Sequence, residues 1–410
     1  MALRSKVLVG QSGGPTAAIN SSLLGVYDAA HAEGFSVLGM RNGIEGLSAR
    51  KVVNLEQILG DPLKAQQLRH TPSSFLGSCR YKLPAVEEDE GVYRRLFALF
   101  DEFGVGAVCY IGGNDSMDTI SKLTSYGELV GSDISFVGVP KTIDNDLVGT
   151  DHTPGYGSAA KFIATVVAEV ARDSSVYDLK SVTFIEIMGR NAGWLAGAAS
   201  LANIDGSDVP DLILLPERPV TEDAVTERIA RVLDSGKQTV VVAVSEGTRR
   251  LDGTLMCAGT PGAAKLDAFG HEAALSGTSR YLASIVGERL GVKTRAVELS
   301  TLQRCATHIA SYVDLHEAYT LGGVAARAAI MGCTGQLPIM ERIGDMPYLI
   351  NYSLADVADV ANREKHVPEQ WICEDGMGVT EDFVRYARPL IKGEVNPFYV
   401  GGIPHHIDML

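Results

Sequence analysis

The segment PKTIDND, residues 140–146, places two carboxylates, Asp144 and Asp146, two positions apart, with Lys141 shortly before them. It follows the apolar run ISFVGV, which is typical of a buried strand. If the segment is extended, the two carboxylates point the same way. One can then accept a proton from a substrate hydroxyl while the other orients a cation, and Lys141 supplies positive charge for a phosphate oxygen. DND alone is most often a turn, but its position at the end of a buried strand favours a site.

A glycine-containing loop follows the first apolar run of the chain. In GQSGGPTAAIN, residues 10–20, Gly13 and Gly14 let the backbone approach a ligand closely before a helix begins. The loop matches neither GxGxxG nor GxxxxGK[ST], so it predicts neither a standard dinucleotide site nor a P-loop. An ordinary turn between strand and helix explains it as well as a phosphate-binding loop does.

A second glycine pair precedes polar side chains in IGGNDSMDT, residues 111–119. Gly113 allows a close approach of the backbone to phosphate, and the oxygens of Asn114 and Asp115 can bind Mg²⁺. The alternative is structural, because Asp115 or Ser116 would also cap the following helix well.

Two later segments combine glycine with charge after an apolar run. Arg190 in MGRNAGWLAG stands between glycines at a predicted helix start, where a guanidinium can hold a phosphate or a sugar with two hydrogen bonds. Glu246 in VSEGT stands at a predicted strand end and could accept hydrogen bonds from sugar hydroxyls.

A sixth segment, TRAVELSTLQR, carries Arg295 and Arg304. A single arginine is more often a surface residue. Five of the six segments, however, follow strong predicted strands and place glycine beside charge, so chance is a poor explanation for the set.

The elements that would position these segments alternate between strand and helix. Apolar runs rich in β-formers predict buried parallel strands at residues 6–10, 106–112, 134–139, 181–187, 211–216 and 239–244. Apolar periodicity predicts helices at residues 16–32, 92–103, 158–172 (after a Ser158 cap) and 221–236. This alternation predicts a doubly wound α/β fold. In such folds ligands bind beyond the carboxyl ends of the strands, where most of these segments lie.

Composition excludes several classes of protein. The 410 residues suffice for two or three domains, and 46% hydrophobic and 21% charged residues are typical of a globular protein. A net charge of −14 argues against general nucleic-acid binding, which needs a basic face. No apolar stretch approaches the roughly 18 residues of a membrane span, and we expect neither a signal peptide nor membrane association. The six cysteines form no CxxC pair, which indicates reduced thiols and a cytoplasmic location.

Six segments together resemble the phosphofructokinase family, and particularly its pyrophosphate-dependent branch. They are GGNDS, PKTIDND, GTDHTPGYGSA, MGRNAGW, SEGT and TRAVELSTLQR. The likeness runs from about Val7 to Arg304 in the family's order, and later residues match loosely. Lipid and nicotinamide-dinucleotide kinases share a GGDGT signal, but TIDND with MGR argues against them.

The resemblance implies two doubly wound Rossmann-like domains that face a cleft. Residues 1–156 would bind the phosphoryl donor, residues 157–304 would bind fructose 6-phosphate, and residues 305–410 would cross back to both. It also implies phosphoryl transfer to the 1-hydroxyl of fructose 6-phosphate with Mg²⁺. A homodimer or homotetramer is expected, because family members borrow arginines across subunits.

The resemblance also implies the role of each site residue. Asp144 would be the catalytic base, assisted by Asp115, Lys141 and Arg190. Donor binding falls to Gly13, Gly14, Arg80 (in FLGSCR) and Gly113. Sugar phosphate binding falls to Thr142, Ile143, Asp144, Met188, Gly189, Arg190, Glu246, Arg295, Thr301 and Arg304. The metal ligands would be Asn114 and Asp146.

The choice of donor depends on Asp115 and Lys141. ATP-using members of the family have glycine at both positions. A carboxylate at position 115 would repel an α-phosphate, whereas Lys141 can neutralise a small donor. We therefore expect pyrophosphate as the donor. The alternatives are an ATP-dependent phosphofructokinase and a non-catalytic regulatory subunit that retains the sugar site.

Three positions depart from the family pattern. Asn114 replaces the usual magnesium-binding aspartate and is a weaker ligand. Thr301 stands where histidine or tyrosine is common. Ser181 stands where another subunit's phosphate-binding arginine is often found, and Lys180 could compensate.

Overall fold

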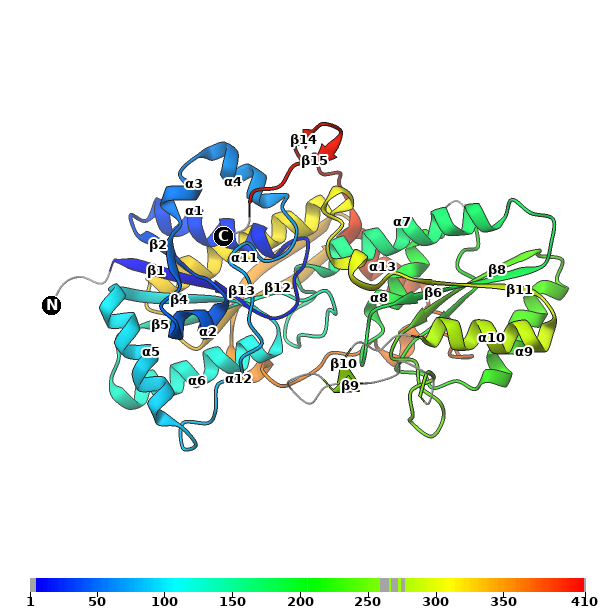
Figure 1. Cartoon of the computed structure of the whole chain (residues 1–410), viewed down its shortest axis with the longest axis horizontal. Coiled ribbons are helices and arrows are strands. Elements are labelled where there is room, and N and C mark those ends of the chain that lie inside the picture. The colour runs from blue at the N-terminus through cyan, green and yellow to red at the C-terminus, as the bar shows by residue number, and fades with distance from the viewer. Residues whose placement is uncertain (1–4, 205, 259–264, 267–271, 274–276, 409–410) are drawn as a thin grey trace.

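Two sheets, each covered by helices, lie side by side along the long axis of the molecule (Figure 1). The structure is a computed structural model and describes residues 5–204, 206–258, 265–266, 272–273 and 277–408. The doubly wound α/β class expected from the sequence is confirmed.

The larger sheet has seven strands in the order β13-β12-β5-β4-β1-β2-β3. Its inner strands β1, β2, β4 and β5 are parallel, whereas the edge strands β3 and β13 are antiparallel to their neighbours. The strand bounds are β1 Lys6–Gln11, β2 Ser36–Met40, β3 Val52–Asn54, β4 Val105–Gly112, β5 Ser135–Pro140, β12 Gln336–Asp345 and β13 Tyr348–Asp356.

Helices cover both faces of the larger sheet. α1 (Ile19–Ala32) and α11 (Tyr312–Ile330) form one core with the strands, and α5 (Glu90–Phe103) and α6 (Asn114–Val130) form the other. α1 and α11 pack very closely, because a Cβ at Gly25 would clash with the carbonyl oxygen of Tyr319.

The smaller sheet has four parallel strands in the order β11-β6-β8-β7. One face packs on α7 (Tyr156–Ser174), and the other on α9 (Glu222–Asp234) and α10 (Thr278–Leu290). The strand bounds are β6 Ser181–Ile187, β7 Leu212–Leu214, β8 Thr239–Ser245 and β11 Lys293–Glu298.

The chain after β11 returns to both sheets. α11, β12 and β13 join the larger sheet, whereas α13 (Glu381–Ala387) packs into the core beside α7. The remaining short helices are α2 Gly43–Ser48, α3 Glu56–Leu59, α4 Pro62–Arg69, α8 Trp194–Gly197 and α12 Val357–Val360. The remaining short strands are β9 Lys265–Leu266, β10 Glu272–Ala273, β14 Tyr399–Val400 and β15 Ile403–Pro404, and 3₁₀ helices span Ala198–Ala202, Ser300–Arg304, Thr307–Ile309, Glu369–Trp371 and Arg388–Ile391.

All six predicted strands are present, but two predicted helix starts are wrong. α1 begins at Ile19 and not at about Thr16. α7 begins at Tyr156, and Ser158 lies inside its first turn instead of capping it. The Ser158 backbone N–H donates to Asp314 Oδ2 over 3.0 Å, and its hydroxyl donates to the same atom. A carboxylate from α11 therefore satisfies the amino end of α7.

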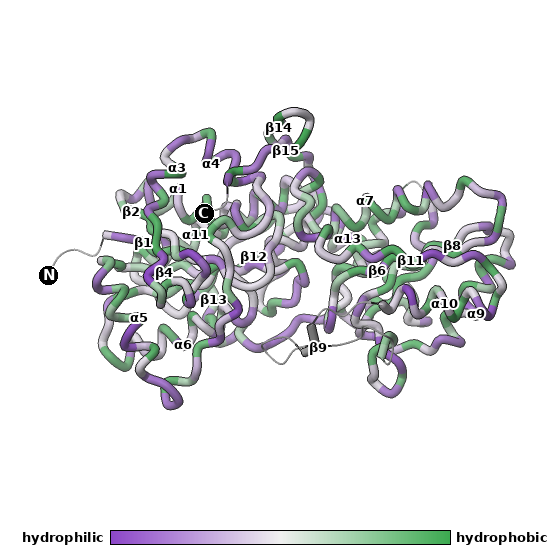
Figure 2. The backbone as a smooth tube through the Cα atoms, in the orientation of Figure 1, coloured by the Kyte–Doolittle hydropathy of each residue, from purple (hydrophilic) through white to green (hydrophobic). Residues whose placement is uncertain are grey.

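Hydrophobic stretches lie mostly inside the two parts, and many outer turns are hydrophilic (Figure 2). Among the described residues, no helix combines the length and the apolar character that crossing a membrane requires.

Candidate functional site

The carboxyl ends of β1, β4 and β5 bring three of the predicted segments together. These strands are neighbours in the larger sheet, so the loops that follow them leave at the same edge. The Ser12 N–H donates to Ile111 O over 2.9 Å, and the Lys141 N–H donates to Gly112 O over 3.0 Å. Backbone hydrogen bonds thus join three segments near their first residues: the glycine loop (residues 10–20), GGND and TIDND.

Lys141 lies directly against the glycine loop. Its Nζ donates to the carbonyl oxygen of Gly14 over 2.6 Å, and its side chain is 2% exposed. Burial lowers the pKa of Lys141 to about 8, although the carboxylates of Asp144 and Asp146 oppose the shift. A buried ammonium at this position can attract an anionic group held by the loop.

The two carboxylates of TIDND are held by a turn and not by an extended strand. Asn145, between them, has φ 56°, so the expected alternation of side chains does not apply. Both ends of its amide are bound: Oδ1 accepts from the Thr153 N–H over 3.0 Å, and Nδ2 donates to Tyr386 Oη over 2.8 Å. Asn145 therefore fixes the turn by which Asp144 is aimed.

Burial raises the pKa values of both carboxyl groups. For Asp144 the hydrogen bond from Thr142 and the charges of Lys141, Arg190 and Arg304 oppose the rise. For Asp146 the pKa rises to about 7, and the neighbouring charge of Asp144 adds to the effect of burial. A carboxylate whose charge is poorly solvated is a better proton acceptor.

The two segments that were predicted to bind the sugar, residues 188–193 (called the sugar-side loop) and SEGT at residues 245–248, meet at the carboxyl ends of β6 and β8. The Gly189 N–H donates to Glu246 Oε1 over 3.3 Å, and the Glu246 N–H donates to Ile187 O over 2.9 Å. Gly189 has φ 138°, which only glycine adopts readily. Burial and the charge of Asp144 raise the pKa of Glu246 to about 7, against the attraction of Arg190. The charges of Asp144 and Arg190 thus act on Glu246.

Arg304 reaches the donor side from the smaller part. A Cβ on Gly14 would lie 3.5 Å from Arg304 Nη1, and the charge of Arg304 acts on both Lys141 and Asp144. Met188, in the sugar-side loop, is held through its N–H, which donates to Gln303 Oε1 over 3.3 Å. Thr301, in the same 3₁₀ turn as Arg304, is exposed.

Arg295 is not brought to Asp144. It pairs with Thr183 in the register of β11 and β6, near the amino ends of both strands, and its guanidinium contacts Asp173 over 3.1 Å. Ser181 begins β6 and Lys180 precedes it, so both lie at the same far edge of the smaller sheet. These residues therefore lie away from the Asp144 loop of this chain.

Asn114 and Asp115 occupy the first turn of α6, and the capping alternative for Asp115 or Ser116 is wrong. The N-cap residue is Gly113, and no side chain caps the helix. Asp115 is exposed, whereas Asn114 Oδ1 is buried and lacks a hydrogen-bond partner within the described part of the chain. The described residues contain no group of three His, Cys, Asp or Glu side chains placed to hold a metal.

Arg80 belongs to a segment that lies against the glycine loop. The Gly13 N–H donates to Cys79 O over 3.4 Å, and the Ser78 hydroxyl donates to Gly13 O over 2.7 Å. Arg80 itself is exposed at this edge of the larger sheet.

Comparison with known proteins decides the family. The phosphofructokinase family model matches residues 6–329. The chain belongs to the phosphofructokinase family. The resemblance seen in the sequence motifs is confirmed.

Two relatives and one solved structure with high similarity to this chain carry a pyrophosphate-dependent activity in their names. The pyrophosphate–fructose 6-phosphate 1-phosphotransferase of Halomonas elongata is 40% identical over 401 residues, which cover 96% of this chain and 93% of that protein. The protein of the same name from Methylococcus capsulatus is 39% identical, over 97% of this chain and 94% of the relative. The crystal structure of pyrophosphate-dependent phosphofructokinase from Nitrosospira multiformis has a TM-score of 0.88 at 34% identity and covers 98% of this chain and 96% of that chain.

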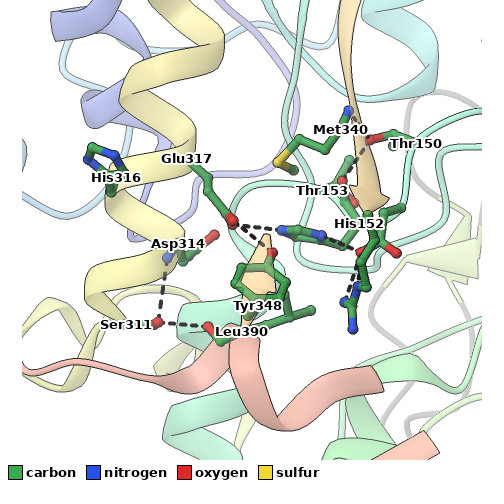
Figure 3. Close-up of polar contacts among 12 residues, drawn as sticks. Thr150, His152, Thr153, Ser311, Asp314, His316, Glu317, Met340, Tyr348 and Leu390 are labelled. Atoms are coloured by element: carbon green, nitrogen blue, oxygen red, sulfur yellow. Dashed lines mark hydrogen bonds and ion pairs between the residues drawn. The ribbon is translucent and has the colours of Figure 1, made fainter. Parts of the chain in front are cut away.

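The structure of this phosphofructokinase also shows a buried polar network that sequence reasoning missed (Figure 3). His152 Nε2 lies 2.7 Å from Glu317 Oε2 on α11, and its Nδ1 lies 2.8 Å from Asp151 Oδ1. The Tyr348 hydroxyl, on β13, donates to Glu317 Oε1 over 2.7 Å. GTDHTPGYGSA contained His152, but nothing in the sequence indicated its partner 165 residues away.

Replacing His152 by glutamine is expected to change how stability depends on pH. Burial lowers the pKa of His152, but Glu317 and Asp151 outweigh it and raise the pKa to about 9. A raised histidine pKa stabilises the fold fully below about pH 6.5, the unfolded value, and the contribution disappears as the pH rises through about 9. This contribution to the free energy of unfolding amounts to about 3 kcal/mol, because each unit of pKa shift corresponds to 1.36 kcal/mol.

Urea unfolding of wild type and His152→Gln at pH 6 and pH 9.5 measures this contribution. The stability difference between the two proteins should be large at pH 6 and should shrink by about 3 kcal/mol at pH 9.5. His31→Gln is the control, because the side chain of His31 is 62% exposed. A difference independent of pH would show that the pKa of His152 is the same in the folded and unfolded protein.

Proposed function

We propose that this phosphofructokinase transfers a phosphoryl group reversibly from pyrophosphate to the 1-hydroxyl of fructose 6-phosphate, giving fructose 1,6-bisphosphate and phosphate. The relatives from Halomonas elongata, Methylococcus capsulatus and Xanthomonas campestris carry this activity in their names. One observation in this chain supports it most directly: the ammonium of Lys141 lies under the glycine loop, 2.6 Å from Gly14 O.

The sugar phosphate is proposed to bind between the two parts. Glu246 would accept hydrogen bonds from sugar hydroxyls, and Met188, Gly189 and Arg190 would hold the ring and its charge. Asp144 would then remove the proton of the 1-hydroxyl as the phosphoryl group arrives. The positive charges of Lys141, Arg190 and Arg304 act on buried Asp144. These fixed charges can stabilise the negative charge of the phosphoryl group during transfer, without a reorganisation of water.

The donor is proposed to bind at the glycine loop, with Gly13, Gly14, Gly113 and Arg80 around it. Lys141 and Arg304 both reach this loop, and two fixed cations suit the charge of pyrophosphate. Asp115 stands in the first turn of α6 and adds negative charge where a longer nucleotide donor would extend. ATP is therefore the weaker candidate.

Phosphofructokinases generally use a divalent metal ion, and we propose Mg²⁺. The residues fit a weakly held ion, because the buried Asn114 Oδ1 has no partner in the described residues and Asp146 offers a carboxylate. Mg²⁺ commonly takes one or two protein ligands and completes its shell with substrate phosphates and water. The ion would neutralise part of the negative charge of the phosphates.

The assembly and location of the enzyme are further parts of the proposal. We place the donor domain at residues 1–156, the sugar domain at residues 157–304 and the connecting segment at residues 305–410. Arg295 lies at the far edge of the smaller sheet with its side chain 44% exposed, which suits donation to a neighbouring subunit's site. We propose that the enzyme is a homodimer or homotetramer located in the cytoplasm.

Paired initial rates test the donor. Wild-type protein with fructose 6-phosphate and Mg²⁺ should produce fructose 1,6-bisphosphate with pyrophosphate and not with ATP. Activity with ATP alone would contradict the roles given to Asp115 and Lys141. Inactivity with both donors would favour a regulatory subunit and identify Asn114 as the defect to test.

A further inference from the structure

A short segment after α12, residues 364–367, connects the two loops that carry the proposed base and the proposed sugar-binding residues. On the side of the base, the Lys365 N–H donates to Asp146 O over 2.7 Å. The Lys365 ammonium donates to Thr150 O over 3.2 Å and to Asp151 O over 2.8 Å. Lys365 therefore binds the loop that contains Asp144 at two places, through its backbone N–H and through its ammonium group.

The same segment is bound to the sugar-side loop. The Trp194 indole N–H donates to Lys365 O over 2.8 Å, and the Lys365 ammonium lies 5.2 Å from the centre of the Trp194 ring. The Asn191 amide donates to Glu364 Oε1 over 3.2 Å. The Val367 N–H and the Gly193 N–H both donate to Glu217 Oε1, over 3.0 and 2.8 Å.

These contacts matter because neither loop belongs to a helix or a sheet. Residues 141–155 contain neither helix nor strand apart from the isolated bridge between Thr142 and Gly155, and Met188 to Gly193 lack helix and strand as well. Their relative position therefore depends on contacts to third segments. Lys365 contacts Asp146, Thr150, Asp151 and Trp194 through its backbone and side chain together. Tyr386 also contacts both sides, through Asn145, Asp151 and the Trp194 ring.

We propose that Lys365 is a positioning residue, which sets the Asp144 loop against the sugar-side loop and so fixes the distance from the base to the sugar hydroxyl. The inference rests on the proposed function, because it assumes that Asp144 and Arg190 act on one substrate. Lys365 touches neither substrate. A displacement of about 1 Å between base and substrate can reduce a rate by up to about 100-fold.

A purely structural role is the competing explanation, and kinetics separates the two. A misplaced base lowers kcat while substrates still bind, so KM changes little, whereas a lost stabilising contact lowers the unfolding temperature without changing kcat of the folded enzyme. Lys161 is a matched control, because its ammonium donates to Gly393 O over 2.7 Å and its side chain is 12% exposed, yet it contacts neither loop.

The experiment measures kcat and both KM values for full-length wild type, Lys365→Met, Lys365→Arg and Lys161→Met. We expect Lys365→Met to lower kcat by about 10-fold with KM values within about twofold, because positioning and not binding is lost. Lys365→Arg should recover part of kcat, since a guanidinium can still donate to the two carbonyls. Lys161→Met should keep the wild-type kcat.

Trp194→Phe supplies a second variant if Lys365→Met does not fold. It removes the hydrogen bond to Lys365 O and keeps an aromatic ring, and it should lower kcat in the same way. If Lys365→Met folds and keeps the wild-type kcat, the inference is overturned, but the proposed function is unaffected. The same holds for Trp194→Phe if that variant has to replace Lys365→Met. A wild-type enzyme inactive with pyrophosphate would instead overturn the proposed function itself.

Discussion

The Asp144→Asn enzyme is expected to lose about 10²- to 10⁴-fold in kcat, the usual contribution of a positioned general base. An amide has nearly the same shape as a carboxylate but cannot take the proton of the sugar hydroxyl. It can still accept the hydrogen bond that the Thr142 hydroxyl donates over 3.2 Å, so the turn should persist. KM values for both substrates should therefore change far less than kcat.

Folding should not explain this loss. Because burial raises the pKa of Asp144, the folded protein disfavours its charged form, and a neutral amide should leave the stability equal or higher. Asp118→Asn is the control, since Asp118 pairs with Lys122 on α6 and has no proposed role in catalysis. Stopped assays with pyrophosphate, alongside thermal unfolding, check both statements. A kcat within tenfold of wild type would mean that another group is the base.

The second large loss of activity is expected when Lys141 is replaced. Replacing it by methionine should lower kcat/KM for pyrophosphate by about 10²- to 10³-fold, the typical cost of removing one preorganised charge that stabilises a transition state. Methionine keeps much of the buried volume but cannot donate to Gly14 O, now 2.6 Å from the ammonium. The loss should concern the donor, so the affinity for fructose 6-phosphate should change little.

Donor kinetics at saturating fructose 6-phosphate, with direct titration of the sugar phosphate, measure this effect. Lys122→Met is the matched control, because its ammonium also donates to a carbonyl, Leu83 O, over 2.9 Å. Equal losses in the two variants would indicate a general effect on α6 and β5. An unchanged kcat/KM for pyrophosphate in Lys141→Met would contradict the donor role of the lysine.

Six parallel strands (β1, β4, β5, β6, β7 and β8) were predictable because each is covered on both faces and therefore appears as a continuous apolar run, whereas the parallel strand β2 was missed. β6, at Ser181–Ile187, coincides with its predicted range. β12 and β13 were missed, since much of this hairpin is partly exposed and its sequence lacks such a run. β11 was also missed, because its residues are only partly buried at the edge of the smaller sheet.

The start of α7 shows why local rules fail at some boundaries. Ser158 is a good cap by type, but the Gly155 N–H donates to Asp314 Oδ1 over 2.8 Å, from a residue 159 positions away. A carboxylate of α11 thus starts the helix earlier than a serine would. No local pattern carries that information.

The sequence by itself determined which groups are available at the site. The strand ends at TIDND, GGND, MGR and SEGT carry a carboxylate, an amide, a guanidinium and a glutamate. Parallel strands in one sheet place the loops that follow them at the same edge. The tertiary structure decided how those groups are aimed and supported. Asn145 turns the TIDND loop, Lys365 joins it to the sugar-side loop, and Arg295 lies away from Asp144. The physical reason is that these outcomes depend on hydrogen bonds and packing between residues far apart in the chain, which form only when both sheets are in place.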